Sequence, residues 1–286
     1  MRADINYSDI IDSDEARIAQ AAADAAPKQH SSEIDPYKFF VSQDETKYTP
    51  ENQEVWQTLF DKRMESLDRQ ASDVFLDGMR AIGLTRDKVP QVTSINGRLA
   101  SLTGWESHPV PGYLPAKAFF ACLAHRKFPT TITVRPKALM DYLPEPDIFH
   151  DIFGHVPLHA DPVFADFLQT YGQAALHAGT EHHVERLARL FWFTVEFGLI
   201  GEGGRTKLYG SGLISSLGES DFALTSPHVD RRPFDMDLVC DTPFEIDHYQ
   251  PILYVLESFE QLRDAMTSYA ERVLEESGVK PKAVLV

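Results

Sequence analysis

Large apolar side chains recur at helical spacing along several stretches of this chain of 286 residues. The longest stretch begins at Thr49-Pro50, where Val55, Trp56 and Leu59 start a stripe that continues to Ile82. Such spacing predicts an amphipathic helix that faces the core, with room for one break before Gly83. The same pattern predicts further helices over residues 116–125, from 161 to 171, from about 181 to 200, and from 259 to near 278.

Short strands and irregular segments are expected between these helices. Residues 130–134 alternate like a short strand, and 244–256 is predicted as a short strand or turn followed by apolar structure. Proline and glycine predict loops through the rest of 90–136, the acidic and proline-rich stretch 221–243 is expected to be irregular, and 201–204 is expected to close the preceding helix. Residues 1–35 are polar and acidic, so we expect a flexible N-terminal extension before one mostly α-helical domain over 36–286.

Composition narrows the classes of partner. The formal net charge is −16, and no run of Lys or Arg is longer than a pair such as Arg231-Arg232, which argues against nucleic acid and anionic membranes. Two cysteines, Cys122 and Cys240, are too few for a disulfide framework, and neither an export signal nor a run of eighteen apolar residues is present. A soluble cytoplasmic protein is therefore expected.

The candidate chemistry lies in the segment Pro144-Glu-Pro-Asp147-Ile-Phe-His150-Asp-Ile-Phe-Gly-His155-Val-Pro157 and in Glu196, a lone carboxylate in an apolar run. Two imidazoles and one carboxylate leave three positions of an octahedral ion open, which favours non-haem Fe(II) over a structural zinc site. Residues five apart lie roughly 140° apart on an ideal α-helix, so a local distortion is needed to bring both rings together. Gly154 and Pro157 make such a distortion plausible.

Two other interpretations compete with an iron site. His155 and His159 are spaced as in a zinc protease, but Val156 stands where that motif has glutamate, and Pro157 interrupts the helix. The histidines can also be core residues without a metal. The nearby carboxylates of Asp147 and Asp151 favour the metal, because they can orient the imidazoles.

A buried Glu196 must pair with a metal or with a cation, for which Arg189 and Lys207 are candidates. Arg135, at the end of the predicted strand, can hold a substrate carboxylate through two parallel hydrogen bonds or form an ordinary surface ion pair.

Four motifs together resemble the pterin-dependent aromatic amino acid hydroxylases, in particular the bacterial members that act on phenylalanine. They are the histidine segment, Trp192-Phe-Thr-Val-Glu196-Phe-Gly-Leu, Tyr209-Gly-Ser-Gly-Leu-Ile-Ser-Ser and Tyr249-Gln-Pro-Ile-Leu-Tyr. The resemblance covers about residues 35–277. It implies a basket-like helical catalytic domain with a few short strands, and Fe(II) held by the catalytic residues His150, His155 and Glu196.

The resemblance also implies a binding place for each small molecule. Tetrahydropterin is expected to stack on Phe119 near Gly112 and Leu114, with Asp151, Ala188 and Phe191 beside it. The amino acid substrate is expected at Arg135, Tyr142, Leu143, Pro144, Trp192 and Ser215. The implied reaction hydroxylates L-phenylalanine to L-tyrosine with O₂.

Some positions depart from the animal members of the family. Asp151, Phe191 and Leu143 stand where those enzymes have Glu, Tyr and Thr, and the apolar Ile246 is similar to the enzymes that act on phenylalanine. The chain has no room for the animal regulatory domain or tetramerisation helix, so a monomer is expected. The alternatives are a tryptophan hydroxylase of the same family, a zinc metallohydrolase with the same three ligands, and a catalytically silent binding protein.

Overall fold

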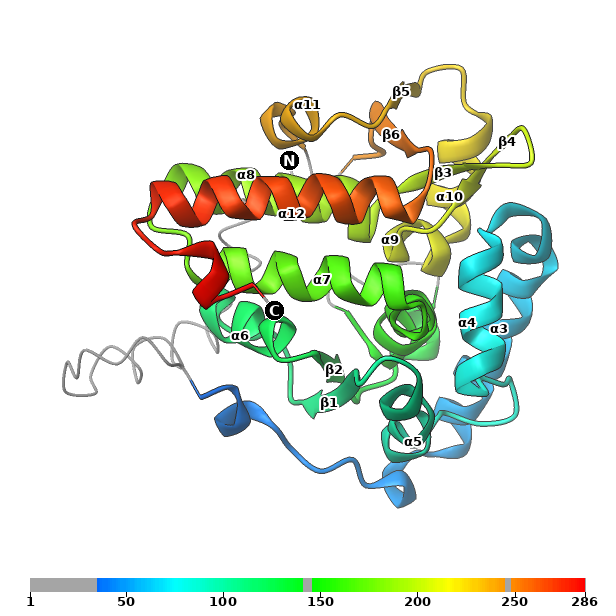
Figure 1. The fold of residues 1–286 in the computed structure, drawn as a ribbon. Helices are drawn as coiled ribbons and strands as arrows, with labels where there is room; N and C mark the ends of the chain where they lie inside the picture. The colour runs from blue at the N-terminus through cyan, green and yellow to red at the C-terminus, as the bar shows by residue number, and fades with distance from the viewer. Residues whose placement is uncertain (1–34, 141–145, 245–247, 286) are drawn as a thin grey trace, which may run out of the picture.

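Helices make up most of the fold and pack around one central helix. The computed structural model describes residues 35–140, 146–244 and 248–285. Helix α7 (Pro162–Leu176) lies between α6 (Ala116–Ala124) and α12 (Phe259–Glu276), while α8 (Glu181–Phe191) packs beside α12 (Figure 1). These four helices confirm the predicted apolar stripes at their positions, and Asp161 caps α7 as its Asp-Pro start predicts.

The long N-terminal stripe forms two helices, α3 (Pro50–Gln70) and α4 (Asp73–Ile82). Thr49 begins α3 with a capping box to Asn52, and the left-handed Gly83 (φ 67°) ends α4. The predicted break lies at Ala71 and Ser72, which are extended and bridge to Leu208 of a neighbouring strand. The break therefore allows one amphipathic stripe to cover two sides of the core.

The strands form two small sheets. Strands β1 (Glu106–Val110) and β2 (Lys127–Thr131) pair in parallel. The second sheet has the order β4-β3-β6-β5, in which β3 (Leu199–Glu202) is antiparallel to β4 (Arg205–Leu208) and parallel to β6 (Ile252–Leu256). Strand β5 (Asp230–Pro233) pairs in parallel with β6 at the other edge. Strand β2 begins three residues before the strand predicted over 130–134 and overlaps its first two residues. Strand β6 lies within 244–256, the segment predicted as a short strand or turn followed by apolar structure.

Several local predictions were wrong. The region of predicted loops contains α5 (Val92–Leu102), and the stretch expected to be irregular contains β5 and α11 (Met236–Asp241), preceded by α10 (Leu217–Thr225). The helix predicted to reach residue 200 ends at Glu196, and Gly203 and Gly204 form a turn between β3 and β4 with φ of 57° and 75°. These short elements depend on packing against the rest of the fold more than on their own propensity.

The remaining elements are short helical segments. They are the 3₁₀ segments η1 (Pro36–Phe39), η2 (Glu45–Lys47), η3 (Lys137–Leu139), η5 (Val156–Ala160) and η7 (Pro281–Ala283), the π-helical segments η4 (Phe149–His155) and η6 (Trp192–Glu196), and α9 (Ser211–Ser215).

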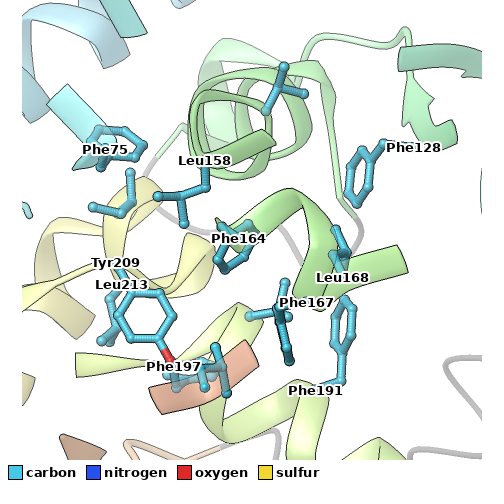
Figure 2. Close-up of a cluster of buried hydrophobic side chains, with 14 of the residues drawn as sticks. Phe75, Phe128, Leu158, Phe164, Phe167, Leu168, Phe191, Phe197, Tyr209 and Leu213 are labelled. Atoms are coloured by element: carbon cyan, nitrogen blue, oxygen red, sulfur yellow. The ribbon is translucent and has the colours of Figure 1, made fainter. Parts of the chain in front are cut away.

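An aromatic core fills the space between α7 and the segments around it. Figure 2 shows Phe164 of α7 between Tyr209 and Phe167, with Phe75 and Phe191 on opposite sides of the cluster. Phe164 and Tyr209 form an edge-to-face pair with ring centroids 6.5 Å apart, and both side chains are fully buried. This core lies directly behind η4 and η6, so close packing restricts how those segments can move.

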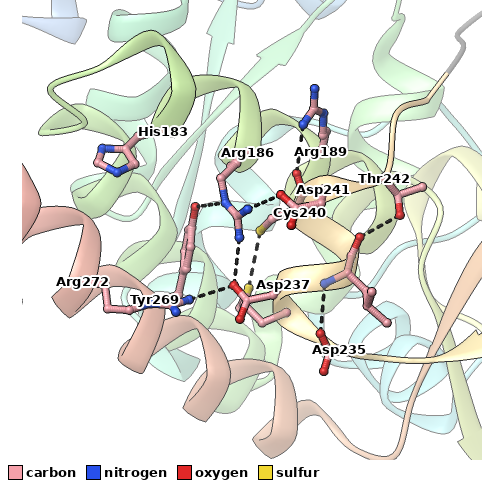
Figure 3. Close-up of polar contacts among 12 residues, drawn as sticks. His183, Arg186, Arg189, Asp235, Asp237, Cys240, Asp241, Thr242, Tyr269 and Arg272 are labelled. Carbon is pink, nitrogen blue, oxygen red and sulfur yellow. Dashed lines mark hydrogen bonds and ion pairs between the residues drawn. The ribbon is translucent and has the colours of Figure 1, made fainter.

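Polar contacts fasten α8 to α11 and α12 on the outside of this core (Figure 3). Arg186 donates to the Tyr269 hydroxyl at 3.1 Å, to Asp237 at 2.9 Å and to Asp241. His183 is buried on α8, with its Nε2 2.8 Å from Glu276. Helix α8 continues into η6, so these contacts also restrain the segment that carries Glu196.

Among the helices of the described residues, none has the length and hydropathy of a transmembrane segment.

Candidate metal centre and active site

Two π-helical turns position the predicted metal ligands. In η4 the Val156 amide donates to the Asp151 carbonyl, and in η6 the Phe197 amide donates to the Trp192 carbonyl at 2.8 Å. Such i→i+5 bonds widen the turn and place residues five apart nearly above each other. The distortion predicted between His150 and His155 is therefore a π-helix, and it turns both rings to the same side.

The three predicted ligands converge on one point. The two histidine Nε2 atoms lie 3.2 Å apart, His155 Nε2 lies 3.2 Å from Glu196 Oε1, and His150 Nε2 lies 3.6 Å from Glu196 Oε2. No other group of three His, Cys, Asp or Glu side chains in the described part of the chain is arranged to hold an ion. The alternative cations for Glu196 are engaged elsewhere, Arg189 with Glu185 and Lys207 with the Arg69 carbonyl.

Serine 215 determines which nitrogen of His150 faces the centre. The Ser215 hydroxyl donates to the Ser211 carbonyl at 2.8 Å, so its oxygen accepts from His150 Nδ1 at 2.9 Å. With its proton on Nδ1, the His150 ring presents the lone pair of Nε2 to an ion. Ser215, expected at the substrate, therefore contacts a predicted metal ligand.

The electrostatics favour the protonation states that bind metals. Burial lowers the pKa of His150 to about 4, and the positive charges of His155 and Arg135 act in the same direction. Burial alone raises the pKa of Glu196, but His155, His150 and the Ser211 hydroxyl outweigh it and bring that pKa to about 2. A neutral imidazole and an ionised carboxylate therefore coexist near pH 7, as coordination requires.

The carboxylates expected to orient the imidazoles have other partners. Asp147 pairs with Arg135 and accepts the backbone amide of His150, not its ring. Asp151 accepts the amide and the hydroxyl of Thr131, both at 2.7 Å, and burial raises its pKa to about 7. Both carboxylates were expected to orient the imidazole rings, but Asp147 binds Arg135 and Asp151 binds Thr131 instead.

Arg135 is held rigidly next to the centre. Its Nε and Nη2 donate to the two oxygens of the fully buried Asp147 at 2.9 and 2.8 Å, and its Nη1 donates to the Met140 carbonyl at 3.3 Å. A guanidinium has five N–H groups. Two of them, on Nη1 and Nη2, form no hydrogen bond with the residues the structure describes, and that edge matches a carboxylate.

Two of the aromatic residues expected at the pterin contact each other, and one of them lies near a metal ligand. Phe119 and Phe191 meet edge to face at 5.7 Å, and Phe191 lies 6.5 Å from the ring of His155. Leu114 is buried in the small cluster against which Phe119 packs, and a side chain at Gly112 would meet no atom within 4 Å. Ala188 is half-buried on α8, one turn before Phe191.

Only some of the residues expected at the substrate lie in the part of the chain that the structure describes. The Trp192 ring stacks on Phe244 at 4.6 Å and contacts Phe197 at the same distance. Tyr142, Leu143, Pro144 and Ile246 lie outside the described residues. Sequence reasoning missed Ser211, Thr131 and Phe244, because their contacts join segments far apart in the chain.

The donor set fits a divalent iron. Two imidazole nitrogens and one carboxylate oxygen lie within 4.8 Å of one another. An octahedral ion accepts six ligand atoms, so these three residues leave three positions open. The ring of Phe191 lies 6.5 Å from that of His155 and contacts Phe119, so aromatic surface suited to a flat, ring-shaped ligand lies close to one metal ligand.

Comparisons with known proteins identify similar sequences and structures. Residues 5–283 match the family model described as biopterin-dependent aromatic amino acid hydroxylase. A phenylalanine-4-hydroxylase of Ralstonia nicotianae is 44% identical over 227 residues, which are 79% of this chain and 72% of that protein.

Two structures of phenylalanine hydroxylase from Chromobacterium violaceum are also similar. One, with bound iron(III) and the oxidised cofactor 7,8-dihydrobiopterin, has 39% identity and a TM-score of 0.79, covering 85% of this chain and 89% of its own. The other, bound to cobalt, has 38% identity and a TM-score of 0.80, covering 87% and 90%. The chain belongs to the family of biopterin-dependent aromatic amino acid hydroxylases.

Proposed function

We propose that this protein is an Fe(II)- and tetrahydropterin-dependent monooxygenase that hydroxylates L-phenylalanine to L-tyrosine with O₂. The observation that carries the proposal is the convergence of His150, His155 and Glu196 in a chain of this family, with the aromatic ring of Phe191 6.5 Å from that of His155. The names of its relatives support phenylalanine as the substrate. No feature of the described residues favours the zinc hydrolase or the silent binding protein.

His150, His155 and Glu196 hold the iron, and Ser215 of α9 keeps the His150 ring oriented. When bound, iron and tetrahydropterin supply the electrons that activate O₂. Phe119 and Phe191 provide the aromatic surface for the pterin, with Gly112, Leu114, Asp151 and Ala188 around it. The protein thus contributes position and electrostatics to chemistry that the cofactors perform.

Arg135 binds the substrate carboxylate through the N–H groups that Asp147 leaves available, while Trp192 packs on the substrate ring. Tyr142, Leu143, Pro144 and Ser215 complete the substrate site, although only Ser215 lies within the described residues. A fixed guanidinium and a fixed aromatic surface orient the substrate without further loss of side-chain freedom.

The catalytic domain spans residues 36–286, and the expected N-terminal extension over 1–35 lies almost entirely outside the described residues. The protein acts as a monomer in the cytoplasm without a nucleic acid or membrane partner. The acidic net charge of −16 and the two unpaired cysteines support this environment. Light scattering after size exclusion tests the monomer directly.

The test of the activity is one reaction that contains purified protein, Fe(II), a tetrahydropterin, air and L-phenylalanine. We expect tyrosine from the complete mixture and none from samples without iron, oxygen or pterin. Parallel reactions with tryptophan distinguish the related hydroxylase. Absence of hydroxylated product from every aromatic amino acid contradicts the proposal.

A further inference from the structure

The hydroxyl of Ser211 lies beside two of the proposed metal ligands, and the family motifs assigned no role to it. Its Oγ is 2.7 Å from Glu196 Oε2 and 3.0 Å from His155 Nε2, and the side chain is buried. We infer that Ser211 is a positioning residue that orients the Glu196 carboxylate for the metal. This inference rests on the proposed function, because it requires an ion bound at the three ligands.

The hydroxyl has one proton and two neighbouring acceptors. An ion at the centre takes the lone pair of His155 Nε2, which leaves that nitrogen without a free acceptor site. The proton of Ser211 then goes to Glu196 Oε2, the nearer atom and the charged one. Glu196 Oε1, which faces His155 at 3.2 Å, keeps its lone pairs for the ion.

The backbone holds the hydroxyl in this place. Gly210, just before α9, is so close to η6 that a side chain there would lie 2.5 Å from the Glu196 carbonyl oxygen. On the other side, a side chain at Gly154 would approach the Ser211 Cβ to 3.2 Å. Ser211 is therefore fixed between the two segments that carry the ligands, and its contact with Glu196 does not depend on a flexible loop.

The experiment compares Ser211→Ala with the wild type as metal-free proteins titrated anaerobically with Co(II), in competition with a chelator. Partners that orient a ligand typically contribute 10- to 100-fold to metal affinity, so we expect about tenfold weaker binding. The visible absorption of the Co(II) form should also change, because a freed Oε2 alters the coordination. A purely structural role for Ser211 predicts no change in this spectrum.

Ser220→Ala is the matched control, since Ser220 is equally buried and donates to the Leu217 carbonyl on α10. It should bind Co(II) with wild-type affinity and spectrum. The unfolding temperature of each metal-free protein shows whether the fold is intact.

Equal affinity and identical spectra for wild type and Ser211→Ala overturn the inference and leave the proposed function in place. If the wild type itself binds no Co(II) or Fe(II), the proposed metal site fails, which is a separate outcome. Weaker binding by Ser211→Ala alone, with a changed spectrum and an unchanged metal-free unfolding temperature, supports the inference.

Discussion

His159 is a buried polar residue that the proposed reaction does not use. Its ring is stacked on Trp105 at 4.8 Å and lies between Phe128 and Phe164, with 1% of the residue exposed. Neither ring nitrogen has a hydrogen-bond partner within the described ranges. A buried polar atom without a partner costs about 1–3 kcal/mol, so His159 reduces the stability of the fold.

Replacing His159 with leucine should therefore stabilise the protein, by about 1 kcal/mol in unfolding free energy near pH 7. The gain should grow in acid. Burial lowers the pKa of His159 well below its ordinary value of 6.5. The unfolded chain takes up this proton below about pH 6.5 and the folded chain does not, so wild-type stability falls as the pH drops. At pH 5 the difference should therefore be larger than at pH 7.

Urea unfolding of both proteins at pH 7 and pH 5 measures this difference. His228→Ala, at an exposed position, is the control and should show no such pH dependence. A His159→Leu protein that is less stable than the wild type at both pH values would show that the histidine has a partner that leucine cannot replace.

Arg135 is the residue that we propose binds the carboxylate of the amino acid substrate. Lysine keeps the charge but cannot bind Asp147 and a substrate carboxylate in two parallel pairs. We expect Arg135→Lys to raise the KM for L-phenylalanine about tenfold or more while changing the KM for tetrahydropterin little.

Steady-state kinetics with each substrate varied in turn check this prediction. Arg86→Lys is a fair comparison, because Arg86 forms the same two-bond pair with Asp61 on the exposed surface. An unchanged KM for phenylalanine in Arg135→Lys removes Arg135 from the substrate site.

Among the elements, α9 depends on a buried cation at its far end. Arg63 of α3 is 2% exposed and donates to the carbonyls of Ile214 at 2.6 Å and Leu213 at 3.4 Å. Burial lowers the pKa of Arg63 to about 10, so it remains charged at neutral pH. Ser211 and Ser215 both lie on α9, so Arg63 restrains the centre without touching it.

Methionine at position 63 keeps the apolar stem but leaves two carbonyls of α9 without their donor. We expect Arg63→Met to lower the unfolding free energy by about 2 kcal/mol. Co(II) affinity should also fall, because the serines lose their fixed position. Thermal unfolding and metal titration measure the two effects. Arg80→Met, at an exposed position on α4, serves as control, and wild-type Co(II) affinity in Arg63→Met contradicts the argument.

The elements also show how far the sequence predicts this fold. Helices α3 and α12 were predicted correctly, because their apolar residues recur at helical spacing and this spacing places them on one buried face. Helix α11 was missed, since it has six residues and begins with an Asp235 cap inside a proline-rich stretch. The metal ligands were predicted from residue type and spacing. The roles of Ser211 and Thr131 were not, because those contacts arise only when α9 and β2 fold against η4.

In the whole molecule, the centre joins parts of the chain that are far apart in sequence. His150 and His155 come from η4, Glu196 from η6 and the two serines from α9, with the aromatic core packed behind them. Metal-free protein must hold an ionised Glu196 and two imidazoles close together without an ion between them. A bound ion satisfies these groups only in the folded state, because unfolding separates them.

Removing the ion should therefore lower the unfolding temperature of the entire domain. At a free metal concentration 100 times its Kd, the ion adds about 2.7 kcal/mol to the unfolding free energy. For a domain of this size, that corresponds to about 5 to 11 °C. Anaerobic calorimetry of chelator-treated protein, with and without Fe(II), measures the shift. Mg²⁺ should produce none, since it prefers oxygen ligands, and Glu196→Ala should lose most of the response to Fe(II). An Fe(II) response that survives in Glu196→Ala would place the ion elsewhere in the protein, because the three-ligand centre no longer exists in that variant.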